Sequence, residues 1–499
     1  MDSWSGTNRH SGFLLSHLES EVRFTEGQIH RIIAGLVLAI FVAAVDSTLV
    51  SVALLSIGKD LGHMEQLPWV MSGYLAASAV ATPIYGKLSD LYGRRPLMLG
   101  SLLGFALTSL GSALAPSMAF LILMRILQGL TGGAVIAMAQ ATIADIVPAR
   151  ERGRYQGWLS ATFASAAMLG PVLGGYLTGL FGWRMVFASM IPLTLLAIWR
   201  VAKVLRLLPV TTKQRPIDWL GAILLSVSLS SLMSFLTLTG QGHRLAEPTM
   251  LLLMGGFFVS TALCIAQERR APEPIIPPSI LSRRGVWVPC VNVTCIFFML
   301  IGLSNMLPIA MQSGGAQSVD EAALRMLPLT LGIPCGAFLA GRWTYRTGAS
   351  RRVIFTGLSL VLSMLGLMIL IPVHAVKPLL FVMGFLGLGS GMVMVTSLVV
   401  AQSSVPAQFT GITTAVVACC RTVGSAVGVS TLAAVLFIAL RDQAPNEQDL
   451  RRLLEIVSTT EAAQAFKAVI VMAFAIAAIP LMTMLAAGRE IGAGLRHKP

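Results

Sequence analysis

The stretch GKLSDLYGRRP, residues 86–96, carries four charged side chains between two long apolar runs. The chain as a whole has 499 residues, of which 55% are hydrophobic and only 12% are charged, and its mean hydropathy is +0.78. Water-soluble domains are far less apolar, so this composition predicts an integral membrane protein. We therefore expect the charged stretch to be a short turn at the membrane surface that joins two spanning helices.

Apolar runs of about 20 residues, the length that crosses a bilayer as a helix, follow one another along the chain. They predict an all-α polytopic membrane protein with fourteen transmembrane helices. The expected segments are a cytoplasmic N-terminal tail (1–31), an N-terminal six-helix bundle (32–202), two inserted transmembrane helices (217–267), a cytoplasmic linker (268–286), a C-terminal six-helix bundle (287–486) and a cytoplasmic tail (487–499).

The positive charge of the chain indicates an orientation in the membrane. A net charge of +14 could attract nucleic acid. However, most of the 36 Lys and Arg residues fall in alternate loops between the predicted helices, and basic loops stay on the cytoplasmic side. We therefore expect no nucleic-acid partner, and a multi-pass protein of the inner (plasma) membrane with both termini in the cytoplasm.

Motifs of enzymes and of metal sites are missing from the sequence. The six cysteines all lie in apolar runs without metal-ligand spacing, so we expect no disulfide and no metal. The sequence has no GxxxxGK[ST] phosphate-binding loop and no pattern of a hydrolytic triad. These observations predict a protein that is not an enzyme, holds no cofactor and is not driven by ATP.

Two parts of the chain repeat one another. GLTGG at 129–133 recurs as GLGSG at 387–391, and VPARERG at 147–153 recurs as VPAQFTG at 405–411. Both pairs are separated by the same offset, which indicates that the two six-helix blocks are related. Many secondary transporters are built from such internal repeats, with the substrate site between the halves.

Four motifs carry a resemblance to a known family. They are VDSTLVSVALLSIGKDL (45–61), GKLSDLYGRRP (86–96), LILMRILQGLTGG (121–133) and AMLGPVLGG (167–175). With these motifs the chain resembles the major facilitator superfamily, and within it the fourteen-helix drug:proton antiporter branch. The resemblance covers nearly the whole chain. It implies the major facilitator fold, transport by alternating access and multidrug efflux coupled to protons.

The same resemblance implies two groups of functional residues: a cytoplasmic gate motif of Gly86, Asp90, Gly93, Arg94 and Arg95, and an antiporter motif of Gly170, Pro171, Gly174 and Gly175. In the first group, Asp90 would accept hydrogen bonds from the N-terminus of a facing helix or from the two arginines, and would so close the cytoplasmic side. Two alternatives stay open: basic residues that only set the topology, and glycines that only allow close packing.

Asp46 is the one acidic residue near the middle of a predicted spanning helix. A charged carboxylate there costs about 2.5–3.5 kcal/mol on insertion scales, so it is usually functional or paired. Counting residues from the helix ends puts Arg125 within about 6 Å of it in depth, which is within reach of an arginine side chain. We therefore expect this pair to couple transport to protons, with a permanent structural ion pair as the alternative.

Arg421 is a second arginine that is predicted to lie deep in a spanning helix. Its stretch CCRTVGSAVG, residues 419–428, resembles the family's arginine followed by paired glycines. The sequence leaves its partner open: an anionic group of the substrate, or backbone carbonyl groups of its own surroundings.

These expectations together describe a proton-coupled secondary transporter that exports small, lipophilic compounds. Its expected partners are a small-molecule substrate, protons and the lipid bilayer, and an accessory export protein is left open. One rival is a dedicated exporter of a single metabolite, siderophore or lipid. A second rival, from a different class, is a non-transporting membrane receptor or scaffold that keeps the fold.

Overall fold

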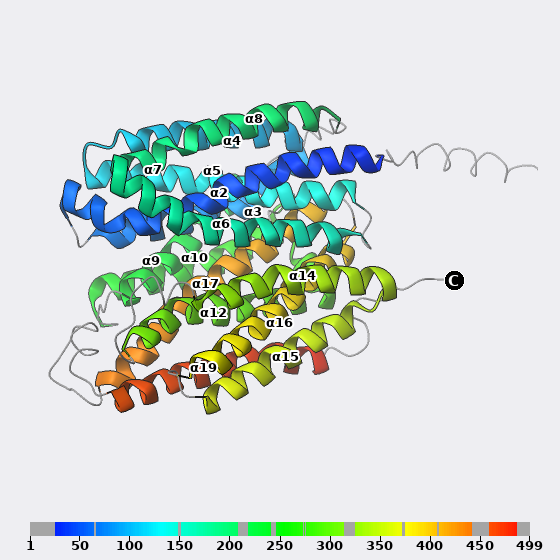
Figure 1. Cartoon of the computed structure of the whole chain (residues 1–499). Coiled ribbons are helices and arrows are strands. Elements are labelled where there is room, and N and C mark those ends of the chain that lie inside the picture. Colours follow the sequence, from blue (N-terminus) through cyan, green and yellow to red (C-terminus); the bar gives the residue numbers. More distant parts are fainter. Residues whose placement is uncertain are drawn as a thin grey trace, which may run out of the picture.

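Helices make up all the regular secondary structure in the described part of this computed structural model (Figure 1). The structure describes residues 25–63, 66–147, 151–207, 218–240, 246–272, 274, 276–313, 325–371, 375–406, 409–441 and 459–486. Most of the predicted tail 1–31 and all of the predicted tail 487–499 lie outside these ranges. The all-α class predicted from the apolar runs is therefore confirmed for the described residues.

In chain order the elements are α2 (Glu26–Leu61), α3 (Leu67–Tyr92), α4 (Arg94–Ala113), α5 (Met118–Ile146), α6 (Arg152–Phe181), α7 (Arg184–Ala188), α8 (Met190–Val204), the short 3-10 helix η2 (Leu205–Leu207), α9 (Trp219–Gly240), α10 (Pro248–Arg270), α11 (Pro278–Leu281), α12 (Arg284–Ser313), α14 (Leu327–Thr347), α15 (Ser350–Leu370), α16 (Val376–Ser403), α17 (Thr410–Arg441) and α19 (Thr459–Ala486).

Helix α2 begins earlier than the sequence predicts. It begins at Glu26 rather than near residue 32 because Thr25 and Gln28 form a capping box. The Thr25 hydroxyl accepts a hydrogen bond from the Gln28 backbone N–H, and the Gln28 side chain accepts one from the Thr25 N–H. Such a box satisfies backbone donors that the first turn leaves free, so the polar residues before the apolar run join the helix.

Twelve helices in the described ranges are long and apolar enough to cross a membrane, with α7 and α8 together forming one of them. The fourteen spans predicted from the sequence are thus not confirmed. The two remaining long helices are α3 and α14, of 26 and 21 residues. Helix α3 packs against α5 and α17, and α14 packs against α16 and α6. Both helices carry polar residues between their apolar ones, among them Thr82 and Ser89 in α3 and Thr330 and Arg342 in α14.

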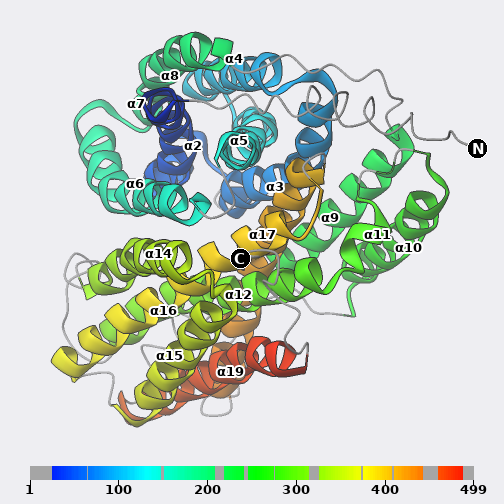
Figure 2. The ribbon, with the colours of Figure 1, turned by 90° about the vertical axis from the view of Figure 1, so that its right-hand side faces the viewer.

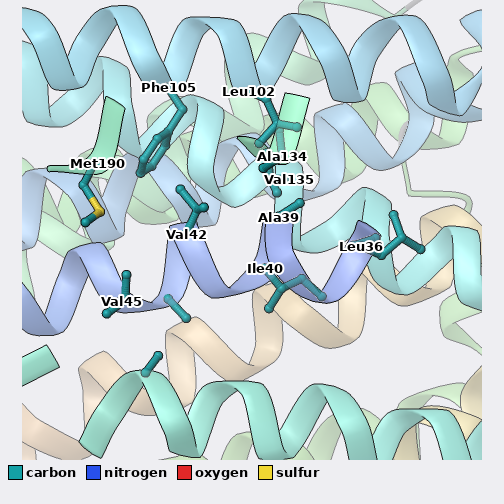
Figure 3. Packing of buried hydrophobic residues seen from close by; sticks show 14 of the residues in the cluster. Leu36, Ala39, Ile40, Val42, Val45, Leu102, Phe105, Ala134, Val135 and Met190 are labelled. Atoms are coloured by element: carbon teal, nitrogen blue, oxygen red, sulfur yellow. The ribbon is translucent and has the colours of Figure 1, made fainter. Parts of the chain in front are cut away.

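Two separate clusters of buried hydrophobic side chains lie in the two parts of the molecule. One is formed by α2 to α8, and in Figure 3 its residues Leu102 and Phe105 of α4 point toward α2, from which Val42 points back toward them. The other is formed by α12, α14 to α17 and α19 and includes Leu358 and Val382. Figure 2 shows these two groups of helices side by side, with α9 and α10 at their flank.

Glycines that correspond in the sequence repeat pack in the same way in the two halves. A β-carbon added at Gly129 or Gly133 of α5 would collide with the backbone of α3. One added at Gly387 or Gly391 of α16 would collide in the same way with the backbone of α14. Each pair of helices therefore meets at van der Waals distance of the two backbones, which only glycine permits.

The two halves meet through α3 with α17 and through α6 with α14. Close contacts lie at the end of the bundle that contains Asp90, which is called the Asp90 end below. There Gly86 of α3 packs on Ala415 of α17, and Gly157 of α6 packs on Phe338 of α14. Helix α9 packs against both α3 and α17 from the flank. The flank of the interface is thus covered by α9.

Candidate functional site

Asp46 and Arg125 form a buried ion pair between α2 and α5. Arg125 Nη1 lies 2.6 Å from Asp46 Oδ2. The two side chains are 1% and 0% exposed, so neither is reached by solvent in this conformation. The structure thus brings together the two residues that depth counting from the helix ends predicts to be partners.

A glutamine completes this pair. The Gln128 amide donates to Asp46 Oδ1 at 3.1 Å, and its Oε1 accepts from Arg125 Nη1 at 2.8 Å. The same amide donates to the Ser109 hydroxyl of α4 at 2.8 Å. Arg125 Nε donates to the Val70 carbonyl of α3 at 3.2 Å. Four helices, α2 to α5, are therefore tied to one charge pair.

Sequence reasoning missed Gln128, although a signal for it was present. Gln128 lies three residues after Arg125, so both side chains share one face of α5. A fully buried glutamine amid apolar residues needs hydrogen-bond partners, and the nearest charged group is the obvious source. Ser109 carried no comparable signal, because small hydroxyls are common in spanning helices and usually bond to their own backbone.

Aromatic rings cover the guanidinium of Arg125. Its Cζ lies 4.3 Å from the centre of the Tyr74 ring and 5.9 Å from that of Phe187. The Tyr74 hydroxyl donates to the Ala43 carbonyl of α2 at 3.3 Å, which holds the ring in place. Within the described residues Arg125 Nη2 has no hydrogen-bond partner. The arginine is thus held by one carboxylate, one amide, one carbonyl and two ring faces, with one donor nitrogen unused.

Arg94 is the centre of the charged turn between α3 and α4. Its Nη2 lies 2.7 Å from Asp90 Oδ1, and its Nε lies 2.8 Å from Asp145 Oδ2 at the end of α5. It also donates to the Ser89 hydroxyl. Asp145 was not among the predicted site residues. The ion pair expected within the motif is therefore present, and it extends to a third helix.

Asp90 also faces the other half of the molecule. A β-carbon added at Gly411, in the first turn of α17, would collide with its carboxylate. Asp90 Oδ2 is buried without a hydrogen-bond partner in the described ranges. Asp90 lies beyond the predicted spanning run, which ends at residue 86, and burial raises the pKa of this carboxyl to about 6, with Arg94 acting in the opposite direction. Contact with α17 thus disfavours the charged form of Asp90.

The two remaining members of the gate motif differ in role. Gly93 has a φ of 88°, in the region that favours glycine, so it makes the turn from α3 into α4. Arg95 was expected to share in binding Asp90, but of the two arginines it is Arg94 that forms the ion pair. Arg95 Nε is buried without a partner in the same ranges.

The glycines of the predicted antiporter motif bring α6 onto α2. A β-carbon at Gly170 would collide with Thr48, and one at Gly174 would lie 2.9 Å from the Leu49 carbonyl oxygen. Gly175 has only an ordinary contact, 3.9 Å to a Val52 methyl group. The Pro171 side chain lies outside the described side chains. Close packing therefore explains Gly170 and Gly174 but not Gly175.

Arg421 of α17 lies apart from the Asp46 pair. Its guanidinium carbon is 5.6 Å from the ring centre of Phe163 in α6 and 5.7 Å from that of Phe297 in α12. Phe163 belongs to the first half of the chain and Phe297 to the second. Backbone carbonyl groups, one of the two partners left open by the sequence, are not seen as acceptors for this side chain in the described ranges.

Comparison with known proteins places this arrangement in a family. The family profile described as Major Facilitator Superfamily matches residues 36–429, which include every site residue discussed above. The chain belongs to the major facilitator superfamily. Members of this superfamily are membrane transporters rather than enzymes, so the chain is expected to move a small molecule.

Two relatives are about 30% identical to this chain over the residues that align. An uncharacterized MFS-type transporter of Mycobacterium tuberculosis is 30% identical over 438 residues, which are 87% of this chain and 62% of the relative. Multidrug resistance protein 3 of Bacillus subtilis is 32% identical over 342 residues, which are 68% of this chain and 65% of the relative. This chain thus spans less than two thirds of the length of either relative.

A solved structure supports the fold. The crystal structure of the human organic anion transporter MFSD10 superposes with a TM-score of 0.65 at 15% sequence identity, over 91% of this chain and 99% of that one. At this identity the likeness concerns the fold alone.

Proposed function

We propose that the protein is a proton-coupled exporter of small, lipophilic compounds that works by alternating access. The observation that carries the proposal is the buried Asp46–Arg125 pair, 2.6 Å apart and 1% and 0% exposed. An acid in a spanning helix that faces an arginine has two stable arrangements: charged and paired, or protonated and released. Such a group can exchange a proton for a change in the packing of its neighbours.

The network around the pair supports a link from proton to helix movement. Protonating Asp46 removes the ionic attraction to Arg125 and one acceptor of the Gln128 amide, and these contacts hold α2 against α5. Because both groups are buried here, a proton reaches Asp46 only after α2 and α5 separate. Protonation would then keep them apart and favour release of substrate, and loss of the proton on the other side would restore the pair.

The Asp90 end fits the cytoplasmic gate of this cycle. The turn at residues 93–95 and its counterpart at 348–352 are basic, as loops on the cytoplasmic side are. Contacts of α3 with α17 and of α6 with α14 close this end in the present conformation. We propose that both termini lie in the cytoplasm of a cell bounded by this inner (plasma) membrane, and that the two halves, 32–202 and 287–486, rock about the interface.

Fourteen crossings remain part of the proposal. Twelve helices meet the length and apolarity of a span. Helices α3 and α14 run beside them between other helices and occupy corresponding places in the two halves. Counting both gives two sets of six with α9 and α10 as the inserted pair, and an even number returns the C-terminus to the side of the N-terminus.

Energy from the membrane is sufficient for this mechanism. Each proton that crosses a membrane potential of 100 mV releases about 2.3 kcal/mol. Since about 1.4 kcal/mol corresponds to a tenfold change in a concentration ratio, one proton supports a gradient of some tens of fold.

The test is uphill flux in proteoliposomes under an imposed pH gradient, with the parent compared with Asp46→Asn. The variant keeps the shape of the side chain but cannot change its charge. We expect the parent to accumulate substrate and the variant to equilibrate it only. A variant that accumulates substrate as well as the parent would show that Asp46 is a structural partner of Arg125 and no proton site.

The breadth of substrates separates the proposal from its closest rival. A dose panel in a host without its own pumps should show resistance to several unrelated lipophilic compounds. Resistance to none of the compounds in the panel would favour a dedicated exporter of one metabolite, siderophore or lipid. Binding of ligand with no flux under any gradient would favour a receptor or scaffold.

A further inference from the structure

Arg421 has an unusual position, because it lies deep in a helix at the interface of the two halves. It comes 11 residues after the start of α17 at Thr410, and Phe163 comes 11 residues after the start of α6 at Arg152. Both are therefore about 16 Å from the Asp90 end, at 1.5 Å per residue. The two Phe rings that flank the guanidinium come from opposite halves of the molecule.

The charge of Arg421 is not balanced by the described residues around it. No described carboxylate lies within 4 Å of its guanidinium, and no described group accepts a hydrogen bond from it. The acid nearest the middle of a span, Asp46, is already neutralised by Arg125. An unpaired cation deep in a membrane protein is costly, and such residues usually mark the path of a ligand or an ion.

The surroundings leave the guanidinium able to bind an anion. Arg421 is half-buried, between two rings that come from opposite halves of the molecule. Phenyl rings satisfy the faces of a guanidinium but offer no acceptor to its N–H groups. Those N–H groups form a rigid fork that matches the oxygens of a carboxylate, sulfonate or phosphate. Phe163 and Phe297 would in addition contact an apolar body attached to such a group.

We propose that Arg421 is the anion-binding residue of the substrate site, and that the transported compounds are lipophilic organic anions. That these anions are transported rests on the proposed function, whereas their binding to Arg421 does not. A lipophilic cation would meet the uncompensated charge of Arg421 at the same place and be repelled. The positive charge of Arg421 therefore selects anionic substrates and excludes cationic ones.

The test is equilibrium binding to the full chain in lipid nanodiscs, with two probes that share one fluorophore. The probes are 1-pyrenebutanoate and 1-pyrenebutylammonium, which at about pH 7.5 carry opposite charges. With signal from empty nanodiscs subtracted, we expect the parent to bind the anion at least about tenfold more tightly than the cation, a difference of about 1.4 kcal/mol. Equal binding, or preference for the cation, would overturn the inference.

Three variants separate a binding role from a structural one. Arg421→Gln should lose the preference for the anion, whereas Arg421→Lys should keep most of it because the charge remains. Arg346→Gln, which removes an exposed arginine of α14, should leave the preference unchanged. If Arg421→Gln weakens both probes equally, or if Arg421→Lys behaves like Arg421→Gln, Arg421 only supports the fold.

The binding assay needs neither a pH gradient nor flux, so the two proposals fail separately. Gradient-driven flux without any preference for anions would overturn this inference and leave the exporter intact. Preference for anions without gradient-driven flux would keep the binding site and overturn the exporter.

Discussion

Asp46 and Arg125 are 79 positions apart in the chain, and their side chains lie 2.6 Å apart in the fold. Neither is exposed by more than 1%. Each would be costly to bury alone, and together they satisfy one another through an ion pair and a shared glutamine. The energetics of this pair lead to the first prediction.

Arg125→Gln should destabilise the protein more than the double variant Asp46→Asn/Arg125→Gln. Removing one partner of a buried ion pair costs about 3–5 kcal/mol, because the other charge is left uncompensated. Neutralising both removes that penalty and leaves two amides that can bond to one another. The measurement is thermal unfolding of the purified protein in detergent. Equal losses in the single and the double variant would mean that the pair carries no net interaction.

Gly174→Ala should lower stability, and Gly175→Ala should not. A β-carbon at Gly174 would lie 2.9 Å from the Leu49 carbonyl oxygen, so α6 or α2 has to move, at a cost of about 1–3 kcal/mol. At Gly175 the nearest atom is 3.9 Å away, and alanine is up to about 1 kcal/mol better than glycine inside a helix. The measurement is the unfolding temperature of each variant. An equal decrease in unfolding temperature for Gly174→Ala and Gly175→Ala would contradict the prediction.

Gly86→Ala should open the Asp90 end, and a second substitution should close it again. A β-carbon at Gly86 would lie 2.6 Å from the Ala415 β-carbon. Removing that methyl group in Gly86→Ala/Ala415→Gly restores the space, although the Gly411 carbonyl oxygen, 3.3 Å away, stays close. We expect the single variant to lose flux and the double variant to recover most of it. If the double variant does not recover flux, the size of the side chains at positions 86 and 415 is not what limits transport.

Stability that depends on Asp90 should increase as the pH falls. The pKa of Asp90 is about 6 in the packed state and 3.8 for an ordinary Asp, so packing favours the protonated form. Its contribution is fully present below about pH 3.8 and is lost as the pH rises through about 6. Between about pH 7.5 and 5 the parent should gain about 1 kcal/mol relative to Asp90→Asn, whose amide does not titrate.

The measurement for Asp90 is the difference in unfolding free energy between the parent and Asp90→Asn at each pH. Using the difference cancels all the other groups that titrate in the same range. A difference that stays constant, or that decreases as the pH is lowered, would show that the helix N-terminus of α17 or the Arg94 guanidinium outweighs burial.

Much of this molecule follows from local pattern. Apolar runs of bilayer length predicted the helical class, and the repeat predicted two related blocks, in which Gly129 and Gly387 make corresponding close contacts. The predicted number of fourteen spans is not confirmed, because α3 and α14 carry polar residues within their apolar stretches and are less apolar than the other twelve. The start of α2 also differed, because a capping box extends a helix beyond its apolar stretch.

The sequence by itself determined that this is a helical membrane protein of two related halves, because hydrophobicity and periodicity are properties of neighbouring residues. It also marked Asp46 and Arg125, because a lone charge in an apolar run is visible without a structure. Only the tertiary structure decided that Gln128 joins this pair, that Asp145 joins Arg94, and that two rings from opposite halves flank Arg421. Those contacts depend on how helices far apart in the chain rotate and pack, which no local pattern records.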